Sequence, residues 1–377
     1  MKDHPKLLMI TTVPITVNAF LIPYACYFRG LGWQVDAMAN GIAEFNGLPI
    51  HFDRTFDVDL SRNPLSPDNM LKTAGTIRKI VYTEGYDIVH AHTPVAAFIA
   101  RFALRGRKRA GGPSVVYTAH GFHFFQGGGK TRNFIFRTLE KIAGPWTDAL
   151  IVINREDFEA ARKYGIALEE NLTYMPGIGL DFSRYDSSAV SKADIRQIHD
   201  QLGIKSGDAL FSMIAEFTPC KRHQDVIEAL AASNNHKIHV AFAGLGSLFE
   251  KTKRLANALK LQSRVHFLDN VKDIRPLVCA SRAVILASSR EGLPRSLMEA
   301  ACLGIPIIGS DARGVRDVVC PNRGLLYPVG DIFALRDAMQ RMFEEPHPRT
   351  APDQDWRIEN LLQLHRELYE ELLRRKE

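Results

Sequence analysis

The sequence predicts an α/β protein made of two Rossmann-like domains that face a central cleft. Short apolar runs bounded by Gly, Pro, Asn or Asp alternate with amphipathic segments along almost the whole chain. This alternation is typical of parallel sheets covered by helices on both faces. A chain of 377 residues is long enough for two separate cores, whereas a single open sheet of about ten strands would be unusually large.

The expected elements follow one another in order. Strands are expected at residues 7–13, 33–38, 87–91, 114–119, 148–153, 209–214, 238–243, 264–268, 282–286 and 305–309. Helices are expected at residues 18–30, 66–84, 131–144, 155–164, 222–232, 248–260 and 331–344. The last segment, 353–374, places Trp356 and several leucines at helical spacing and predicts one long amphipathic helix.

The segment 176–190 is the expected boundary between the domains. It begins Pro-Gly-Ile-Gly and continues through residues that favour turns and helix caps. We therefore expect a first domain over 1–182, a second over 183–352, and a C-terminal helix over 353–377 that packs back on the first domain. Open sheets of this kind bind ligands at the carboxyl ends of their strands.

Composition excludes several classes of protein. Hydrophobic residues make up 46% of the chain and charged residues 24%, as in ordinary globular proteins, and the net charge of +6 is too small to indicate nucleic acid. The five cysteines form no CxxC pair, which indicates reduced thiols. Since neither a membrane-spanning stretch nor a signal peptide is recognisable, we expect a cytoplasmic protein.

One cluster of cations stands out in the first half. Arg101, Arg105, Arg107, Lys108 and Arg109 fall within nine residues. The cluster is either a solvated helix end or a surface for anionic lipid, where each basic side chain contributes roughly 1 kcal/mol. Any membrane contact would be peripheral, at the inner face of the plasma membrane.

The most informative stretch follows the expected strand at 282–286. Glu291 lies in the loop after this strand, and Pro294 suits the start of a helix that carries Glu299 in about its second turn. The first-turn amides and the dipole of such a helix suit a diphosphate. Two carboxylates so placed could accept hydrogen bonds from both ends of a sugar nucleotide. Without this context they would be a surface residue and a helix-start residue.

This stretch resembles the E-x7-E motif of glycosyltransferase family 4, a large retaining family with the two-domain GT-B fold, and the similarity extends along nearly the whole chain. The resemblance implies that Glu291 binds hydroxyls of the transferred sugar and that Glu299 binds the nucleotide ribose. It also implies that the main chain around Gly292, Leu293 and Pro294 approaches the sugar and the phosphates of the donor.

A second stretch, after the expected strand at 209–214, is similar to the family's G-R-x4-K-G segment. Lys221 matches the lysine that neutralises the donor diphosphate. Glu216 replaces the usual arginine, and a carboxylate there would repel phosphate. Either Glu216 points elsewhere or Arg222 supplies the missing charge. His223 is expected to be structural.

Histidines mark strand ends in the first half. His120 matches the family's His-Gly segment, which implies that it faces the donor and could donate a hydrogen bond as charge builds on the leaving group. His90 and His92 share a strand face at a spacing that a metal could use, but no further ligands converge, so structural roles are expected. The loop 11–20 lacks the Gly-Gly pair common in the family, and Asn18 is expected to cap a helix.

Two glycine-rich segments imitate nucleotide-binding motifs. Residues 126–131 lack the first glycine of a P-loop, so we expect a mobile loop on the acceptor side instead. Residues 244–249 lack the third glycine of a dinucleotide fingerprint, which argues against a dehydrogenase. No aromatic and basic residues interleave as in a nucleic-acid module.

The residues and the resemblance together predict a hexosyltransferase that needs neither metal nor cofactor, with His120 and Glu291 as catalytic residues. The donor would be a nucleotide sugar, with UDP-sugars favoured. The acceptor would be a glycan or a polyprenyl-diphosphate-linked saccharide in capsule, exopolysaccharide or O-antigen biosynthesis. A nucleotide-sugar 2-epimerase of the same fold and a non-catalytic sugar-nucleotide-binding protein are the alternatives. The donor sugar, the acceptor and the oligomeric state stay open.

Overall fold

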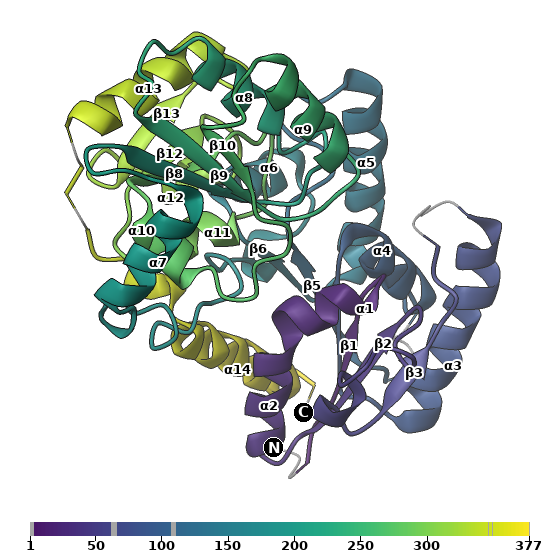
Figure 1. Ribbon diagram of the computed structural model, residues 1–377. Helices are drawn as coiled ribbons and strands as arrows, with labels where there is room; N and C mark the ends of the chain where they lie inside the picture. Colours follow the sequence, from purple (N-terminus) through teal and green to yellow (C-terminus); the bar gives the residue numbers. More distant parts are fainter. Residues whose placement is uncertain (1–3, 62–65, 107–110, 346, 349, 377) are drawn as a thin grey trace. The chain divides into compact units, whose positions relative to one another are not determined.

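The computed structural model describes residues 4–61, 66–106, 111–345, 347–348 and 350–376. The chain divides into two compact units (Figure 1). Unit 1 comprises Met1–Ile178 together with Glu359–Glu377, and unit 2 comprises Gly179–Ile358. The chain thus first passes from unit 1 to unit 2 after residue 178, four residues before the expected boundary after residue 182. Each unit is described by itself below.

Unit 1 is built on a sheet of seven strands in the order β3-β2-β1-β4-β5-β6-β7, with every neighbouring pair parallel. The strands are β1 (Lys6–Ile10), β2 (Gln34–Ala39), β3 (Thr55–Asp57), β4 (Ile88–His92), β5 (Ser114–Ala119), β6 (Ala149–Val152) and β7 (Leu172–Tyr174). The α-helices are α1 (Pro14–Thr16), α2 (Ile22–Gly30), α3 (Ala74–Glu84), α4 (Pro94–Ala103), α5 (Lys130–Ala143), α6 (Arg155–Tyr164) and α14 (Ile358–Arg374). Strands β4 and β5 are buried along their whole length, as central strands of parallel sheets are.

Local signals in the sequence begin and end several of these helices. The side chain of Asn154 accepts a hydrogen bond from the first turn of α6, and Gly165 ends that helix in the left-handed conformation. The loop after β1 differs from the expectation. There α1 continues into a π-helical turn, Val17–Leu21, so Asn18 lies inside a helical stretch and caps nothing.

Helix α14 completes unit 1 with the last part of the chain. It begins at Ile358 and not at the expected residue 353, because Gln354–Trp356 form a 3₁₀ turn whose tryptophan is buried in the core of unit 2. The buried face of α14 includes His365 and Tyr369. Just beyond the helix, Nζ of Lys376 donates to the carbonyls of Asp87 and Gly112, at 2.9 and 3.0 Å.

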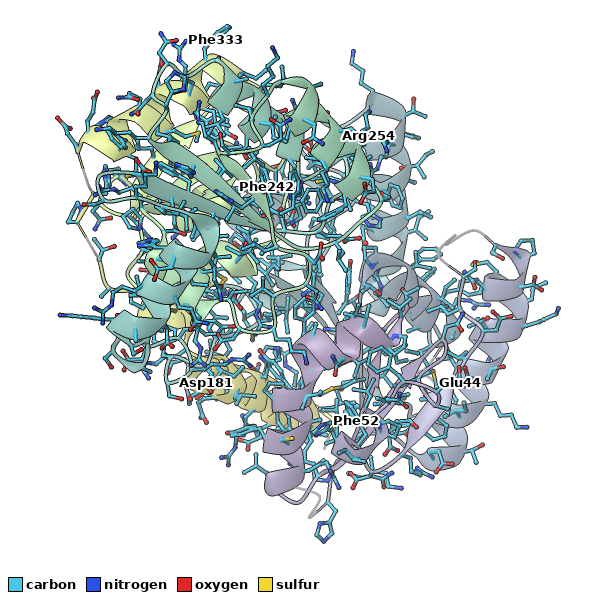
Figure 2. The ribbon with its side chains drawn as sticks, in the orientation of Figure 1. Glu44, Phe52, Asp181, Phe242, Arg254 and Phe333 are labelled. Carbon is cyan, nitrogen blue, oxygen red and sulfur yellow. The ribbon has the colours of Figure 1, made fainter. Side chains whose placement is uncertain are left out.

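Unit 2 is built on a sheet of six parallel strands in the order β10-β9-β8-β11-β12-β13. The strands are β8 (Ala209–Ile214), β9 (Ile238–Ala243), β10 (Val265–Phe267), β11 (Ala283–Leu286), β12 (Ile307–Ser310) and β13 (Gly324–Tyr327). The helices are α7 (Lys192–Leu202), α8 (His223–Ala231), α9 (Phe249–Ala258), α10 (Arg275–Ala280), α11 (Arg295–Cys302), α12 (Val315–Val318) and α13 (Ile332–Glu344). Figure 2 shows Phe242 among the strands of the core, where it is fully buried, and Phe333 at the outer edge, where it is 63% exposed.

In both sheets the strand order reverses at one place. Strands β1 and β4 flank the reversal in unit 1, and β8 and β11 flank it in unit 2. Ligands of open α/β sheets bind beyond the carboxyl ends of the strands at such a reversal. The loops that follow these four strands are therefore the places where functional side chains are expected.

The cation cluster at 101–109 was expected to lie on the surface, but its first residue does not. Arg101 is buried, donates to the carboxylate of Glu140 at 2.8 Å and lies over the ring of Tyr117. Arg105, just beyond the end of α4, donates to the carbonyl of Phe102 in that helix, and residues 107–109 lie outside the described residues. Arg101 is thus an interior cation and not part of a lipid-binding surface. Within the described ranges, no helix combines the length and the apolarity needed to cross a bilayer.

Candidate active site

The loops after β8 and β11 bring a lysine and a glutamate together. Nζ of Lys221 lies 2.5 Å from Oε1 of Glu291, although the two residues are 70 positions apart. The same carboxylate oxygen accepts a hydrogen bond from the hydroxyl of Ser288. The side chains of Lys221 and Glu291 are 25% and 13% exposed, so solvent screens this pair only in part. The sequence expected both residues in one site, and the structure joins them directly.

Backbone contacts fix the position of the loop that carries Glu291. Its amide donates to the carbonyl of Arg313, and the Arg313 side chain donates back to the carbonyl of Glu291, both at 3.0 Å. Gly314 has a φ of +75°, and a Cβ there would lie 2.2 Å from the carbonyl oxygen of Gly292. The loop therefore depends on glycine at position 314.

Helix α11 begins directly after this loop. Pro294 precedes its first turn, and no side chain caps the helix. Gly292 and Leu293 are partly exposed, and Pro294 is buried. Since the first turn contains no acidic residue, its amides and the positive end of the helix dipole can bind an anion.

Glu299 lies one turn further along α11, but it has partners of its own. Its carboxylate accepts a hydrogen bond from the hydroxyl of Tyr185 at 2.6 Å and one from Nε of Arg295 at 2.8 Å. Burial and the charge of Glu299 raise the pKa of Tyr185 to about 12, so this phenol stays protonated and can donate. Tyr185 was not expected in the site, because it lies in the segment interpreted only as a domain boundary.

Arg222 and Glu216 lie near Lys221 in the chain, and their surroundings differ. Nε of Arg222 donates to the buried carboxylate of Asp225 at 2.6 Å, and the residue has a left-handed backbone with φ of 53°. Its guanidinium is thus engaged at the start of α8. Glu216 is exposed. His223 is buried and stacked on Phe217, and burial lowers the pKa of its imidazole to about 4, in keeping with a structural role.

The two glycines at 244 and 246 have a packing role. A Cβ at Gly244 would lie 2.2 Å from the carbonyl oxygen of Ala215, and one at Gly246 would lie 2.6 Å from the amide nitrogen of Phe217. Both glycines have positive φ values. They let the loop after β9 lie against the loop after β8, and so help to place Lys221.

In unit 1 the expected residue His120 is part of a stack of rings. Nε2 of His120 lies 3.1 Å from Nδ1 of His92, and the two rings stack at 5.3 Å. Phe20, from the π-helical turn after β1, stacks on His120 at 5.8 Å. Burial lowers the pKa of His120 to about 4, so the ring is neutral near pH 7. Phe20 was not predicted as a site residue, because its loop lacks the glycines by which the family's segment is recognised.

The turn that carries His120 is held by Asp157. Gly121 has a φ of +115°, and the next amide, that of Phe122, donates to the carboxylate of Asp157 at 3.0 Å. The glycine-rich segment that follows is held by Asn133, whose side chain donates to the carbonyl of Phe125 at 2.8 Å. The turn after β5 is therefore anchored to α5 and α6.

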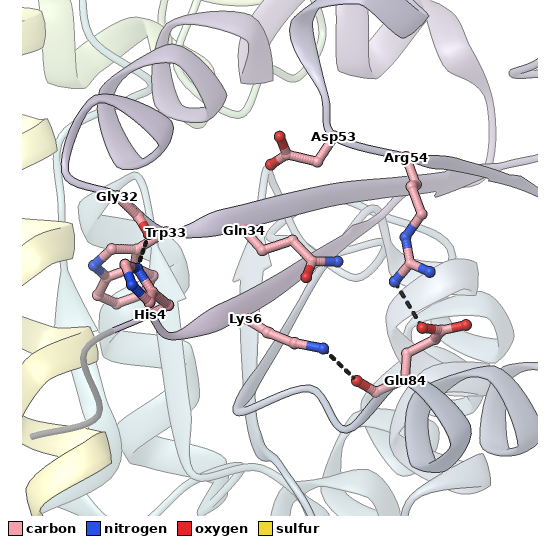
Figure 3. A pocket seen from close by; sticks show the side chains of 8 residues that line it. All are labelled: His4, Lys6, Gly32, Trp33, Gln34, Asp53, Arg54 and Glu84. Atoms are coloured by element: carbon pink, nitrogen blue, oxygen red, sulfur yellow. Dashed lines mark hydrogen bonds and ion pairs between the residues drawn. The ribbon is translucent and has the colours of Figure 1, made fainter.

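A charged cavity lies at the opposite end of the unit 1 sheet (Figure 3). Its volume is about 530 Å³, and its lining includes the first residues of β1 and β2, Lys6 and Gln34. The cations in it already have partners, since Lys6 donates to the carbonyl of Glu84 and Arg54 pairs with the Glu84 carboxylate at 2.8 Å. Because it lies at the amino ends of the strands, it does not belong to the candidate site.

No group of three or more His, Cys, Asp and Glu side chains in the described part of the chain could hold a metal ion. His90, one of the two histidines with metal-like spacing, uses both ring nitrogens within the protein, toward Tyr369 and Thr118.

Two family models and a curated relative match most of this chain. The model of the family described as glycosyltransferase family 4 matches residues 23–176, and that of glycosyl transferases group 1 matches residues 194–357. EpsD of Bacillus subtilis, a provisionally named glycosyltransferase, is 32% identical over 345 residues, which cover 90% of this chain and 88% of EpsD.

A second relative and a solved structure of similar fold have more specific names or bound ligands. An Escherichia coli protein named UDP-Gal:alpha-D-GlcNAc-diphosphoundecaprenol alpha-1,3-galactosyltransferase is 29% identical over 73% of this chain and 71% of its own. Among solved structures, HepE from Anabaena in complex with UDP and glucose superposes with a TM-score of 0.79 at 18% identity, covering 98% of this chain and 100% of HepE. These matches do not favour the epimerase alternative. The chain belongs to glycosyltransferase family 4 and has the GT-B fold.

Proposed function

We propose that this glycosyltransferase moves a hexose from a UDP-sugar to a lipid-diphosphate-linked saccharide or glycan, with retention of the anomeric configuration, in the assembly of a surface polysaccharide. The observation that carries the proposal is the contact of Lys221 with Glu291 next to the uncapped start of α11. A cation and a carboxylate in adjacent loops, followed by the positive end of a helix dipole, suit a ligand with phosphates at one end and hydroxyls at the other. The names of the E. coli relative and of the HepE complex support the choice of UDP.

Each site residue then has a distinct role. The diphosphate pairs with Lys221 and lies near the backbone amides of Gly292 and Leu293 and those of the first turn of α11, which Pro294 precedes. Glu291 then releases Lys221 and accepts hydrogen bonds from hydroxyls of the sugar. Glu299 accepts from the ribose, and Tyr185 and Arg295 hold its carboxylate in place. His120 donates to the sugar or to a phosphate oxygen. Arg222 contributes by bracing the Lys221 loop through Asp225.

The proposed chemistry is substitution on one face of the sugar. The acceptor oxygen bonds to the anomeric carbon as the bond from that carbon to the diphosphate oxygen breaks. The departing oxygen takes the proton of the acceptor hydroxyl, so no protein nucleophile is needed. Negative charge develops on the diphosphate, where Lys221 and the dipole of α11 stabilise it. We propose that this positive charge takes the place of a metal ion.

The proposal is tested by donor binding followed by transfer. Thermal shift with UDP-, GDP-, ADP- and dTDP-sugars should select a UDP-sugar, and transfer to a polyprenyl-diphosphate-linked saccharide should follow in the presence of EDTA. Glu291→Ala should reduce transfer by about 10²- to 10³-fold and retain the circular dichroism spectrum, while the matched surface variant Glu250→Ala on α9 should transfer normally. Donor binding without transfer to any acceptor would instead favour a non-catalytic sugar-nucleotide-binding protein.

We also propose that a membrane surface holds the lipid-linked acceptor beside the enzyme, and that helix α5 of unit 1 contacts it. Phe134, Ile135 and Ile142 are 61%, 44% and 50% exposed on this helix, and their spacing places them on one face. Large apolar side chains exposed together on one helix are typical of an interaction surface.

The charges of α5 indicate an anionic lipid surface. Lys130, Arg132 and Lys141 are exposed on this helix, whereas its one acidic residue, Glu140, is buried and neutralised by Arg101. The outward charge is therefore positive around an apolar face, as in helices that lie in the membrane interface.

Sedimentation with vesicles tests this contact. The wild type should bind phosphatidylglycerol vesicles more than phosphatidylcholine vesicles, and added salt should weaken the binding. Replacing Phe134, Ile135 and Ile142 by serine should reduce the bound fraction several-fold. Phe333→Ser, which removes an equally exposed phenylalanine from α13, should have no effect. Equal binding of the triple variant and the wild type would refute the role of α5.

A further inference from the structure

A line of contacting rings ends at His120. His90 lies at the start of this line, with Nδ1 2.5 Å from the hydroxyl of Tyr369 and Nε2 2.7 Å from the hydroxyl of Thr118. The ring of His92 packs on His90, with the centroids 4.0 Å apart. Nδ1 of His92 then lies 3.1 Å from Nε2 of His120. Strand β4 carries two of these rings, and β5 leads into the third.

One nitrogen in this line is buried without a partner. Nε2 of His92 is inaccessible to solvent and makes no hydrogen bond within the described part of the chain, and His92 as a whole is 4% exposed. Burial and the neighbouring imidazoles hold the pKa of His92 well below its usual value. The ring is therefore neutral and carries a single N–H, either on Nδ1 or on Nε2.

The unpartnered nitrogen decides where that proton lies. If Nε2 of His92 carried it, a hydrogen-bond donor would be buried without an acceptor, which proteins avoid more strictly than a buried acceptor without a donor. If Nδ1 carries it, His92 donates to Nε2 of His120, and only a lone pair is left without a partner. The second arrangement has the lower free energy.

We propose that His92 is a positioning residue that sets the tautomer of His120: it donates to Nε2 of His120 and so leaves the proton of His120 on Nδ1. Nδ1 of His120 has no partner in the described part of the chain, and the ring itself is partly exposed. Phe20 stacks on the ring and limits its rotation. A neutral N–H donor is thus held in a single orientation, ready for a sugar hydroxyl or phosphate oxygen. This inference rests on the proposed role of His120 in donor binding.

The test begins with the wild type, where no variant can misfold. Long-range ¹H–¹⁵N spectra of ¹⁵N-histidine-labelled protein at pH 7.5, assigned with His120→Asn, should show His120 as the Nδ1–H tautomer and His92 likewise. An Nε2–H tautomer of His120 would overturn the proposal at once. This result is independent of activity, so it separates failure of the inference from failure of the proposed function, which an absence of sugar transfer by the wild type would reveal.

Two variants of His92 then test the consequence. His92→Phe keeps the ring stack but has no donor, so the His120 spectrum should become a mixture of tautomers and kcat should fall about 10-fold, as for one lost hydrogen bond, with little change in KM for the donor. In His92→Asn the amide can donate from nearly the position of Nδ1, so the tautomer and most of kcat should be restored. A His120 spectrum that is unchanged in His92→Phe would contradict the proposal.

Discussion

In unit 2 the candidate side chains lie in ion pairs, whereas in unit 1 they are neutral rings. Lys221 and Glu291 contact each other directly, and Glu299 is paired with Arg295. His120 and His92 are uncharged near pH 7, because burial lowers the pKa of each imidazole. The ion-paired residues follow β8 and β11, which flank the reversal of the unit 2 sheet, whereas His92 ends β4 and His120 follows the neighbouring strand β5 in unit 1. The ends of parallel strands thus carry opposite electrostatic arrangements in the two units.

The difference shows what each set can do before a ligand arrives. Charges that already neutralise one another can be exchanged for the charges and hydroxyls of a ligand without leaving an ion unpaired. A neutral ring adds direction to a hydrogen bond but no net attraction for an anion. This difference fits the proposed roles, in which the side chains of unit 2 bind the charged donor and His120 donates a directed hydrogen bond.

The largest expected effect comes from separating the Lys221–Glu291 pair. Lys221→Ala and Glu291→Ala should each reduce kcat/KM by about 10²- to 10³-fold, because charge stabilisation of the leaving group or positioning of the sugar is lost. The double variant should be little worse than either single one, since each residue leaves the other unpaired. Steady-state kinetics measure this cycle, with Lys251→Ala as the control. Additive losses would mean that the two side chains act independently.

A smaller effect is expected for the neutral donor of unit 1. His120→Ala should lower kcat/KM by about 10- to 100-fold, the range for one hydrogen bond to a charged group. His120→Asn should lose less, because its amide can still donate. Since the pKa of His120 is about 4, both variants should keep the wild-type pH profile between pH 6 and 8. A limb near pH 6.5 that disappears in His120→Asn would show that the ring acts as a charged acid.

The buried imidazoles should make unit 1 sensitive to acid. Burial lowers the pKa of His365 from 6.5 to about 4, so between these values the unfolded chain binds a proton that the folded chain does not. Stability is then complete above pH 6.5 and falls as the pH drops toward 4. For one such histidine the loss at pH 5.5 is about 1.4 kcal/mol.

Urea unfolding measures this loss. Trp33 packs against Tyr369, so a variant in which Trp146 and Trp356 are replaced by phenylalanine reports on unit 1 alone. His365→Phe in that background should reduce the difference in unfolding free energy between pH 7.5 and 5.5 by about 1.4 kcal/mol. An unchanged difference would mean that His365 does not titrate with unfolding.

The smallest effect is expected at Tyr185. Tyr185→Phe removes one of the donors that hold Glu299, and Arg295 retains the other, so KM for the donor should rise about 3-fold, near 0.7 kcal/mol, with kcat unchanged. Tyr327→Phe is the matched control, because the buried hydroxyl of Tyr327 has no hydrogen-bond partner in the described part of the chain. Equal kinetics of the two variants would remove Tyr185 from the site.

The sequence was sufficient for the alternation of strands and helices and for the positions of Glu291, Lys221 and His120 at strand ends. It could not show that Lys221 contacts Glu291, because that depends on β8 lying next to β11 in the sheet. Strands β3, β7 and β13, of three or four residues, were missed, although strands as short as β10 were predicted.

The roles of side chains whose partners are distant in the chain also could not be predicted from the sequence. Arg101 was assigned to a surface cluster. Its hydrogen bond to Glu140, a residue 39 positions away in the sequence, shows that it is internal. The role of Tyr185 could not be predicted for the same reason, because its partner Glu299 is 114 positions away in the sequence.

The placement of α14 has a consequence for how this chain folds during translation. Tyr369, which bonds to His90, and Lys376, which bonds to the carbonyls of Asp87 and Gly112, leave the ribosome after all of unit 2. Until α14 has left the ribosome, unit 1 therefore remains incomplete, and the imidazole of His90 lacks one partner. A nascent chain stalled before α14 should expose the surface that this helix covers and recruit chaperones there, while unit 2, continuous in the chain, can already be folded.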